Sequence, residues 1–358
     1  MSEKKKKRGC FGRLIRVGCL LFVAALGAAG YLGWQLLEQP HGDFTDPVAI
    51  TIERGSGATA IFERLANAGV IVHPLAARAY HQAIGSPPLL AGEYRFDTPM
   101  PLPAVIDKVA RGEIETHPVT LIEGLDLAES AASLASQGFG DEAVFLDEMR
   151  DPTRIRDLDP EAESLEGYLY PDTYRFGAEA SEAEIVDMLV AAFRQRWEND
   201  VAPGFEPGRI TGLDTVRDVV SLASIVEKEA RLAEERPVIA AVYTNRLEIG
   251  MGLYADPTVI FALKRRGTWD GNIRKKDLQV DDPYNTYRYR GLPPGPIASP
   301  AIASLLAVTA PADVPYLYFV SRNDGSHVFA ESIQEHNRNV NVWQKQYWRK
   351  KWAEEGRN

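Results

Sequence analysis

Two glutamates separated by a single residue end the segment SLASIVEKEA: Glu227 and Glu229. A carboxyl group can give a proton to a leaving oxygen and then, as a carboxylate, remove another, so this pair suggests acid–base catalysis. At ~100° per helical residue the two positions are ~200° apart, so they cannot face one cleft as a close pair. Helical periodicity does not choose between them, and a solvated Glu-Lys-Glu on a helix surface is the competing interpretation.

Other catalytic motifs are missing from the sequence. No glycine-rich phosphate loop follows a strand, and there is neither a GxSxG elbow nor an HExxH helix. The six histidines are scattered, two cysteines cannot make a four-cysteine metal site, and Asp281-Asp282 is typical of a solvated acidic turn. The sequence therefore implies no metal and no organic cofactor.

The two glutamates lie in a predicted helix over residues 216–231, whose apolar positions are Val219, Leu222, Ala223 and Val226. Further helices are expected at 182–197, 235–248 and 256–264, the last with Asp256 as its N-cap. The segment 163–176 contains Pro171 and is not expected to be a regular helix. Asn323-Asp324-Gly325 predicts a hairpin between strands at 317–320 and 327–330.

A smaller module is predicted between residues 45 and 118. A strand at 48–52 precedes a helix at 58–68 that Gly69 ends, and a similar strand and helix follow over 89–112. Small peptidoglycan-binding modules of the LysM type have strands, turns and helices in this kind of order. We therefore expect a LysM-like α/β module.

The charge of the chain is unevenly distributed. The formal net charge is −10, which argues against a protein that coats nucleic acid, but residues 1–16 hold seven cationic side chains and one glutamate. The formal net charge of residues 1–16 is therefore +6, and that of residues 17–358 is −16.

An uncharged stretch over 17–37 follows the basic segment. At ~1.5 Å per residue it reaches ~31 Å, enough for a hydrocarbon core of ~30 Å. Tyr31 and Trp34 near its far end suit a membrane interface, and the basic cluster places the amino terminus in the cytoplasm. The alternative is a signal peptide cleaved near Ala28-Ala29-Gly30. Either interpretation exports the remainder.

Five blocks over residues 121–336 carry a family resemblance: LEGYLYPDTY, SLASIVEKEA, NRLEIGMGLYADPTVIFAL, YNTYRYRGLPPGPIASP and YLYFVSRNDGSHVF. Their order and spacing resemble the endolytic murein transglycosylase family (membrane-bound lytic transglycosylase G, YceG-like). Two departures are Tyr254, where glutamine is expected, and Ala301, where glycine is usual. They bear on the shape of one substrate subsite.

The resemblance implies cleavage of peptidoglycan glycan strands between N-acetylmuramic acid and N-acetylglucosamine, within the strand. Glu227 matches the catalytic acid, with Glu229 as its companion. Protonated Glu227 would protonate the glycosidic oxygen, then take the proton of the muramic acid 6-hydroxyl as it closes a 1,6-anhydro ring. Water is not consumed, so the enzyme would be a lyase. A glycoside hydrolase would instead need a second carboxylate at a fixed separation.

Weaker candidates for substrate binding come from the same blocks. Hydroxyl and N-acetyl groups of the sugars could be bound by Glu166, Tyr168, Asp172, Asn285, Thr286, Tyr287 and His327, with core packing as the alternative for the aromatic side chains. The basic, aromatic tail over 343–358 is expected to be an amphipathic helix docked on the domain, with a lipid-bound helix as the alternative.

The sequence as a whole predicts an α+β enzyme on a single-pass anchor. The expected parts are a cytoplasmic basic segment at 1–16, a transmembrane helix at 17–37, the LysM-like module at 45–118, a catalytic transglycosylase domain at 119–342 and the tail at 343–358. The expected partners are glycan strands and, by resemblance, cell-wall synthesis enzymes. The rival interpretation is a membrane-tethered peptidoglycan-binding scaffold without activity.

Overall fold

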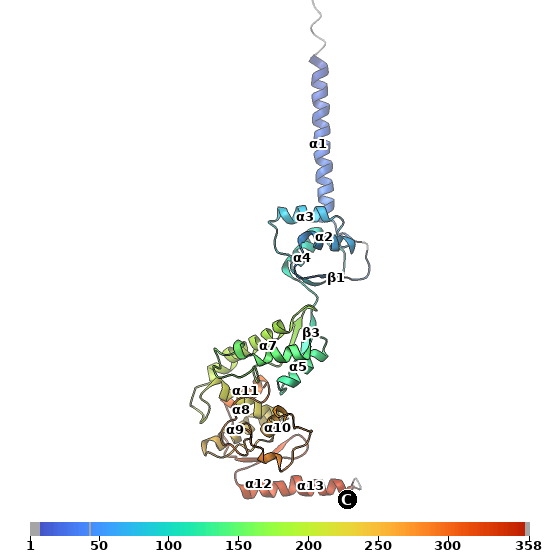
Figure 1. Ribbon diagram of the computed structural model, residues 1–358. Helices are drawn as coiled ribbons and strands as arrows, with labels where there is room; N and C mark the ends of the chain where they lie inside the picture. Colours follow the sequence, from blue (N-terminus) through green and yellow to red (C-terminus); the bar gives the residue numbers. More distant parts are fainter. Residues whose placement is uncertain (1–7, 43, 355–358) are drawn as a thin grey trace, which may run out of the picture. The chain divides into compact units, whose positions relative to one another are not determined.

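A computed structural model describes residues 8–42 and 44–354, so the first seven residues of the basic segment, Lys4–Lys7 included, lie outside the described residues. The fold is α+β, as predicted: it is mostly helical, with three two-stranded sheets in the described part of the chain (Figure 1). The chain divides into two compact units. The first contains Met1–His117 and Arg175–Glu179, and the second contains Pro118–Tyr174 and Ala180–Asn358.

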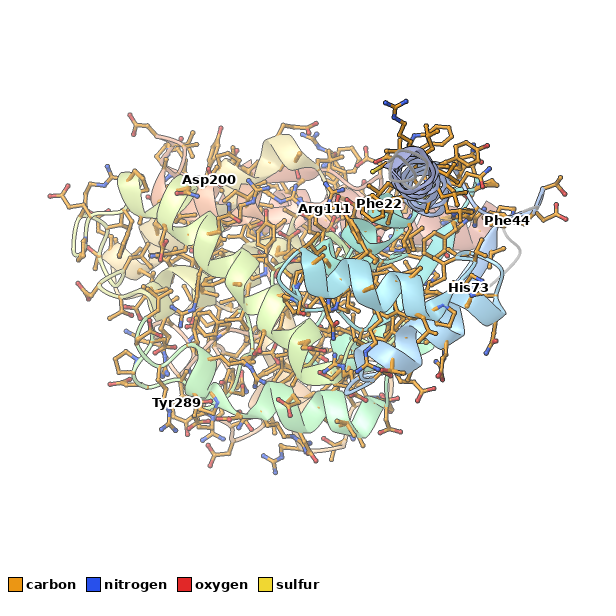
Figure 2. All side chains as sticks on the ribbon, turned by 90° about the horizontal axis from the view of Figure 1, so that it is seen from above. Phe22, Phe44, His73, Arg111, Asp200 and Tyr289 are labelled. Carbon is orange, nitrogen blue, oxygen red and sulfur yellow. The ribbon has the colours of Figure 1, made fainter. Side chains whose placement is uncertain are left out.

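The first unit begins with the long helix α1 (Arg8–Glu38). Its stretch Arg16–Gln35 has a mean hydropathy of 1.8 and none of it is buried, so it is long and apolar enough to cross a membrane; a signal sequence has the same properties. Figure 2 shows the side chains of α1, Phe22 among them, radiating away from the helix, and Phe22 is 65% exposed.

The rest of the first unit is built on one antiparallel strand pair. The strand β1 (Val48–Ile52) pairs with β2 (Gly92–Phe96), and two helices lie between them in the chain, α2 (Ala58–Asn67) and α3 (Pro74–Ala83). The helix α4 (Leu102–Arg111) follows. Both predicted strands and helices are present, but α3 was not predicted.

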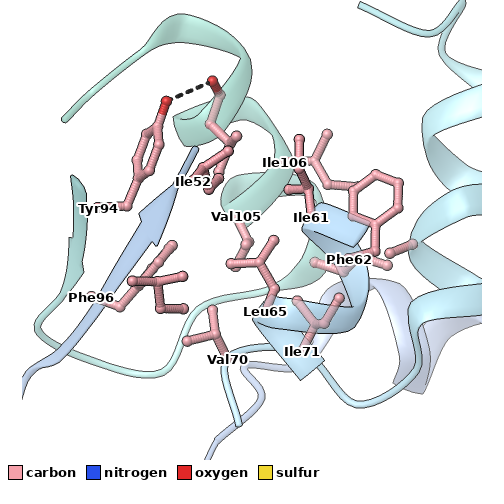
Figure 3. Close-up of a cluster of buried hydrophobic side chains, with 14 residues drawn as sticks. Ile52, Ile61, Phe62, Leu65, Val70, Ile71, Tyr94, Phe96, Val105 and Ile106 are labelled. Atoms are coloured by element: carbon pink, nitrogen blue, oxygen red, sulfur yellow. Dashed lines mark hydrogen bonds between the residues drawn. The ribbon is translucent and has the colours of Figure 1, made fainter. Parts of the chain in front are cut away.

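Alternating strand residues and one face of each helix form the core of this unit (Figure 3). Ile52 and Tyr94 from the strands pack with Phe62 of α2 and Val105 of α4. The buried Tyr94 hydroxyl donates to the carbonyl of Val109, 3.2 Å away, so the one polar group of that ring is satisfied.

The second unit is mainly helical. Its helices are α5 (Leu127–Ser136), α6 (Glu142–Arg150), α7 (Glu182–Arg196), α8 (Val216–Glu229), α9 (Arg236–Glu248), α10 (Asp256–Arg265), α11 (Ile302–Thr309), α12 (Ile333–Val340) and α13 (Tyr347–Glu354). The predicted hairpin is present as β5 (Tyr318–Ser321) and β6 (His327–Ala330), which pair antiparallel. The third sheet, β3 (His117–Thr120) with β4 (Thr173–Phe176), is formed where the chain passes from one unit to the other.

The helix α8 lies at the centre of the second unit, in contact with α9, α10 and α11 (Figure 1). It starts with a capping box in which Thr215 and Asp218 each bond the other's backbone N–H. Every residue from Val219 to Glu227 is buried, so the helix is enclosed on all sides. In its last turn Glu227 therefore lies in the packed interior of the unit, while Glu229 is partly buried and Lys228 between them is exposed.

Candidate active site

Glu227, in the last turn of α8, accepts hydrogen bonds from three donors. Arg236, at the start of α9, places Nη2 2.8 Å from its Oε1. Its Oε2 accepts from the backbone N–H of Ala301 at 3.0 Å and from Ser304 Oγ at 2.7 Å, both at the start of α11. The side chain of Glu227 is only 3% exposed. Its carboxylate thus joins three helices, and neither oxygen is left without a partner.

Glu229 has a different environment, although it is only two residues away. It is partly buried, and one carboxylate oxygen accepts from the hydroxyl of Tyr243 on α9 at 3.1 Å. Burial, with the negative charge of Asp256, raises the pKa of Glu229 to about 7, against smaller lowering effects from Tyr243 and Arg246. At neutral pH a large share of the molecules therefore has this carboxyl protonated, as a general acid requires.

Arg246 lies among aromatic rings, one of which belongs to Tyr243, the residue that bonds this carboxyl. The guanidinium carbon of Arg246 lies 5.9 Å from the ring centres of Tyr243 and Tyr254 and 5.6 Å from that of Tyr318. Its Nε donates to the carbonyl of Leu317 at 2.7 Å. Burial lowers the pKa of Arg246, which remains charged at neutral pH. Aromatic faces around a protonated carboxyl are suited to holding a sugar ring.

The rings of Tyr243, Tyr254, Tyr287 and Tyr318 are called the aromatic cluster below. Tyr287 connects this cluster to α10. Its hydroxyl donates to Asp256 Oδ1 at 2.6 Å, and its ring lies 5.5 Å from that of Tyr254. Tyr254 is 42% exposed and has a φ of +50°, an uncommon conformation for a tyrosine. The prediction that Asp256 caps α10 is wrong: Ala255 is the N-cap and Asp256 is the first helical residue, where its charge favours the helix dipole.

Asn285 and Thr286, expected to bind substrate, are buried beside Tyr287. The Asn285 amide donates to the carbonyls of Leu278 at 3.1 Å and Val280 at 2.8 Å. The Thr286 hydroxyl accepts from the N–H of Ala255 at 3.0 Å. These bonds fix the loop that presents Tyr287 against α10.

Glu166 and Tyr168 line a cavity of about 720 Å³ in the second unit, and Glu229 is not among its lining residues. One oxygen of Glu166 accepts from the N–H of Leu127 at 3.1 Å, while the other is buried and has no partner among the described residues. Burial raises the pKa of Glu166 to about 8. The Tyr168 hydroxyl donates to Asp159 Oδ2 at 2.5 Å.

Asp172 and His327 lie elsewhere in the unit. Asp172 is exposed and accepts from the N–H of Thr173 at 2.7 Å. The ring of His327 lies edge-on to Phe319, and both its Nδ1 (2.7 Å) and its backbone N–H (2.8 Å) bond Glu235. His327 thus attaches the hairpin to the start of α9.

The tail is partly described. A π-helical turn at Asn341–Gln346 leads into α13, and the carbonyl of Trp343 accepts from the Asn323 side chain at 2.6 Å. The ammonium of Lys351 lies 5.0 Å from the centre of a Trp348 ring. The side chains of Lys350 and Trp352, and residues 355–358, lie outside the described set.

Residues 50–342, most of the chain, match the YceG-like family. The chain belongs to this family. The resemblance found from the five sequence blocks is thereby confirmed, and the matched range includes α8 with both glutamates and every residue of the aromatic cluster.

Members of the family with curated names are similar along most of the chain. The endolytic murein transglycosylase of Bacillus subtilis (strain 168) is 32% identical over 328 residues, which cover 87% of this chain and 89% of that protein. The protein of the same name from Streptococcus pneumoniae serotype 2 is 28% identical; the match covers 90% of this chain but only 64% of that protein.

A solved structure from the family is also similar. The crystal structure of a YceG-like protein from Listeria monocytogenes has 30% sequence identity and a TM-score of 0.53, and the match covers 82% of this chain and 99% of that one. The mixed, mostly helical fold described above is thus one that a solved family member shares.

Sequence reasoning missed several residues that form the site. Tyr243, Arg246 and Arg236 lie on α9 and were not singled out. The available signal was the arginine in NRL, because it follows the apolar run VIAAV of the same helix and a buried charged residue needs a dedicated set of partners. Arg246 is buried, as that signal would have suggested.

Proposed function

We propose that this protein cleaves the glycan strands of peptidoglycan endolytically, between N-acetylmuramic acid and N-acetylglucosamine, and leaves 1,6-anhydromuramic ends. The observation that carries the proposal is a carboxyl group with a pKa of about 7, at Glu229, which accepts a hydrogen bond from Tyr243. Membership of the YceG-like family and the names of the two relatives agree with it.

A single carboxyl group is enough for this reaction. Glu229 gives its proton to the glycosidic oxygen as the bond to the anomeric carbon breaks, which leaves an oxocarbenium-like sugar. The resulting carboxylate removes the proton from the 6-hydroxyl of the same sugar, whose oxygen bonds the anomeric carbon. The proton balance closes on Glu229, no water enters, and the exposed Tyr254 with Tyr287 supplies aromatic surface for the sugar ring.

The contacts favour Glu229 over Glu227 for the acid. The resemblance implied Glu227, but that side chain is 3% exposed and faces an arginine and two further donors. Both carboxylate oxygens of Glu227 are occupied by these protein donors, whereas a general acid must present an oxygen to the substrate. We assign to Glu227 the role of a positioning residue that fixes α8 against α9 and α11.

The proposal includes a place in the cell. The helix α1 would anchor the protein in the cytoplasmic membrane with its amino terminus inside, so that both units work on nascent strands outside. The strand–helix–helix–strand order of the first unit supports a LysM-like module that holds glycan. An enzyme that ends strand growth at the membrane would act close to the wall-synthesis machinery.

Purified full-length protein in detergent, incubated with glycan strands, tests the activity. We expect mass spectrometry to detect fragments with anhydro ends from the unaltered protein and none from Glu229→Gln. The control, Glu248→Gln, alters an exposed glutamate at the end of α9 and should leave the yield of these fragments unchanged. Glu227→Gln should retain part of the activity if the protein still folds. Strand binding without new ends in the unaltered protein would establish the inert scaffold instead, and full activity of Glu229→Gln would remove that residue from the mechanism.

A further inference from the structure

The cavity that contains Glu166 is a second feature of the catalytic unit, and the proposed reaction does not use it. It has a volume of about 720 Å³ and lies between the start of α5, the 159–168 segment, the end of α10 and residues 294–296. That volume is within the range of small-molecule sites in proteins. Phe261, Trp269 and Tyr284 supply aromatic surface to its wall.

Most of the charged groups in this wall are paired within the protein. Three of its four cations are in ion pairs: Lys264 with Asp126 at 2.8 Å, Arg217 with Asp159 at 3.0 Å, and Arg150 with Asp147 at 3.3 Å. The fourth, Arg265, is exposed and lies 4.6 Å from the centre of the Tyr284 ring. Glu129 shares Lys264, and Glu163 is exposed to solvent. The ion-paired groups are not available to a charged ligand, so apart from the exposed Arg265 and Glu163 the wall favours an uncharged one.

Glu166 supplies the polar group that such a ligand needs. Its Oε2 is occupied by the N–H of Leu127, but its Oε1 is buried and has no partner in the described part of the chain. Buried polar atoms are nearly always hydrogen-bonded, so an unpartnered one in a cavity wall marks a place for a ligand atom. Because burial disfavours the charged form, this carboxyl can donate to a hydroxyl or carbonyl at neutral pH.

An uncharged ligand with many hydroxyls and an apolar ring face fits this combination. The ring of Tyr284 lies 4.9 Å from that of Phe261, which makes a continuous aromatic wall. Sugars stack on such faces and bond a neighbouring carboxyl with their hydroxyl groups. A peptide, by contrast, would present backbone groups and side-chain charges for which this wall offers few free partners.

The helix α10 links the cavity to the Glu229 site. Its first residue, Asp256, bonds Tyr287 of that site, and Lys264 and Arg265 near its other end line the cavity. Eight helical residues at ~1.5 Å each put the two places ~12 Å apart, which is more than the width of one sugar ring. A strand bound in both places would therefore extend by more than one sugar beyond the bond that is cleaved.

We propose that this cavity is a distal subsite for uncharged sugar residues of the glycan strand, and that it sets the shortest strand the enzyme cleaves well. The role in cleavage rests on the proposed function, but sugar binding by the cavity does not. A strand held at both places is cut within its length, at a fixed distance from the sugars in the cavity.

Binding is tested first, without chemistry, on full-length protein in detergent with the Glu229→Gln change. The probe is the uncharged N-acetylglucosamine hexamer, whose affinity is measured by calorimetry. Trp269→Ala and Glu166→Gln are each introduced into this protein as separate second substitutions, and Trp343→Ala is the control outside the cavity. Loss of one stacking or carboxyl contact should weaken binding about fivefold to tenfold, and Trp343→Ala should change nothing. Equal affinity in all the variants would overturn the subsite, as would tighter binding of a free stem peptide.

Cleavage is tested next, on the active protein with strands of graded length. We expect Trp269→Ala to raise KM for long strands, to leave kcat unchanged and to broaden the distribution of fragment lengths. An unchanged KM and fragment distribution would refute the length-setting role. If the unaltered protein made no anhydro ends the proposed function would fail, while the titration would still decide whether the cavity binds sugar.

Discussion

The hydroxyl of Tyr243 lies 3.1 Å from a carboxylate oxygen of Glu229, and the two residues come from consecutive helices, α9 and α8. A donor at this distance stabilises the carboxylate, so Tyr243 counteracts the burial that holds the carboxyl protonated. The proton affinity of the proposed acid is therefore set by a balance between its burial, Asp256 and Tyr243. That balance can be shifted in either direction by single substitutions.

Tyr243→Phe removes the donor and should raise the pKa of Glu229 above about 7. Since the protonated form is the active one, kcat/KM falls as pH rises through this pKa, and the descending limb of the profile should move to higher pH by about half a unit to one unit. Tyr289→Phe, at an exposed tyrosine that bonds Asp281, is the control. An unmoved limb would separate Glu229 from the activity.

Asp256→Asn should move the same limb in the opposite direction. The negative charge of Asp256 raises the pKa of Glu229, so its removal lowers that pKa, while asparagine can still accept from Tyr287. The rate–pH profile of kcat/KM checks this, with a shift to lower pH of about half a unit to one unit expected. A shift to higher pH would contradict the electrostatic account of the site.

Arg236→Met should destabilise the second unit strongly. It leaves Glu227 buried without its cation, and breaking a buried ion pair from one side costs about 3–5 kcal/mol. Glu227→Gln in the same chain removes the stranded charge and should recover much of the loss. Denaturant unfolding of the two single variants and the double variant measures the coupling, and strictly additive losses would show that the pair does not act as a unit.

Glu166 should make stability depend on pH. Its pKa is about 8 in the folded protein and 4.5 as the reference value, so the native state holds more protons between these limits. The contribution of Glu166 to the free energy of unfolding is then fully present below about pH 4.5 and is lost as pH rises toward about 8. Its upper bound is about 1.4 kcal/mol per unit of pKa shift. Glu166→Gln should flatten this slope in thermal unfolding at pH 5 to 8; an equal slope in both proteins would contradict the raised pKa.

The membrane anchor makes a separate prediction. A tag at the amino terminus should stay with the washed membrane after alkaline extraction, and protease should reach it only from the cytoplasmic side. The mature protein should keep residues 8–38 by mass spectrometry. Release of a protein that starts after Gly30 would identify a cleaved signal peptide.

The sequence predicted most elements that carry a clear hydrophobic period. The helices α2, α7, α8, α9 and α10 lie within a few residues of the predicted ranges, because each buries one face or, for α8, the whole helix. The helices α3, α6, α11 and α12 were missed. The helix α12 buries none of its residues, and α3 and α6 bury two each, so these three carry hardly any hydrophobic period; α11 has only eight residues.

The sequence by itself determined that Glu227 and Glu229 lie on different sides of one helix, since that follows from helical geometry alone. Only the tertiary structure decided what each carboxyl meets. Glu227 meets Arg236 and the start of α11, and Glu229 meets Tyr243 and the charge of Asp256. The charge state of a carboxyl depends on its burial and on neighbours brought from distant parts of the chain, and no local pattern in EKE records either.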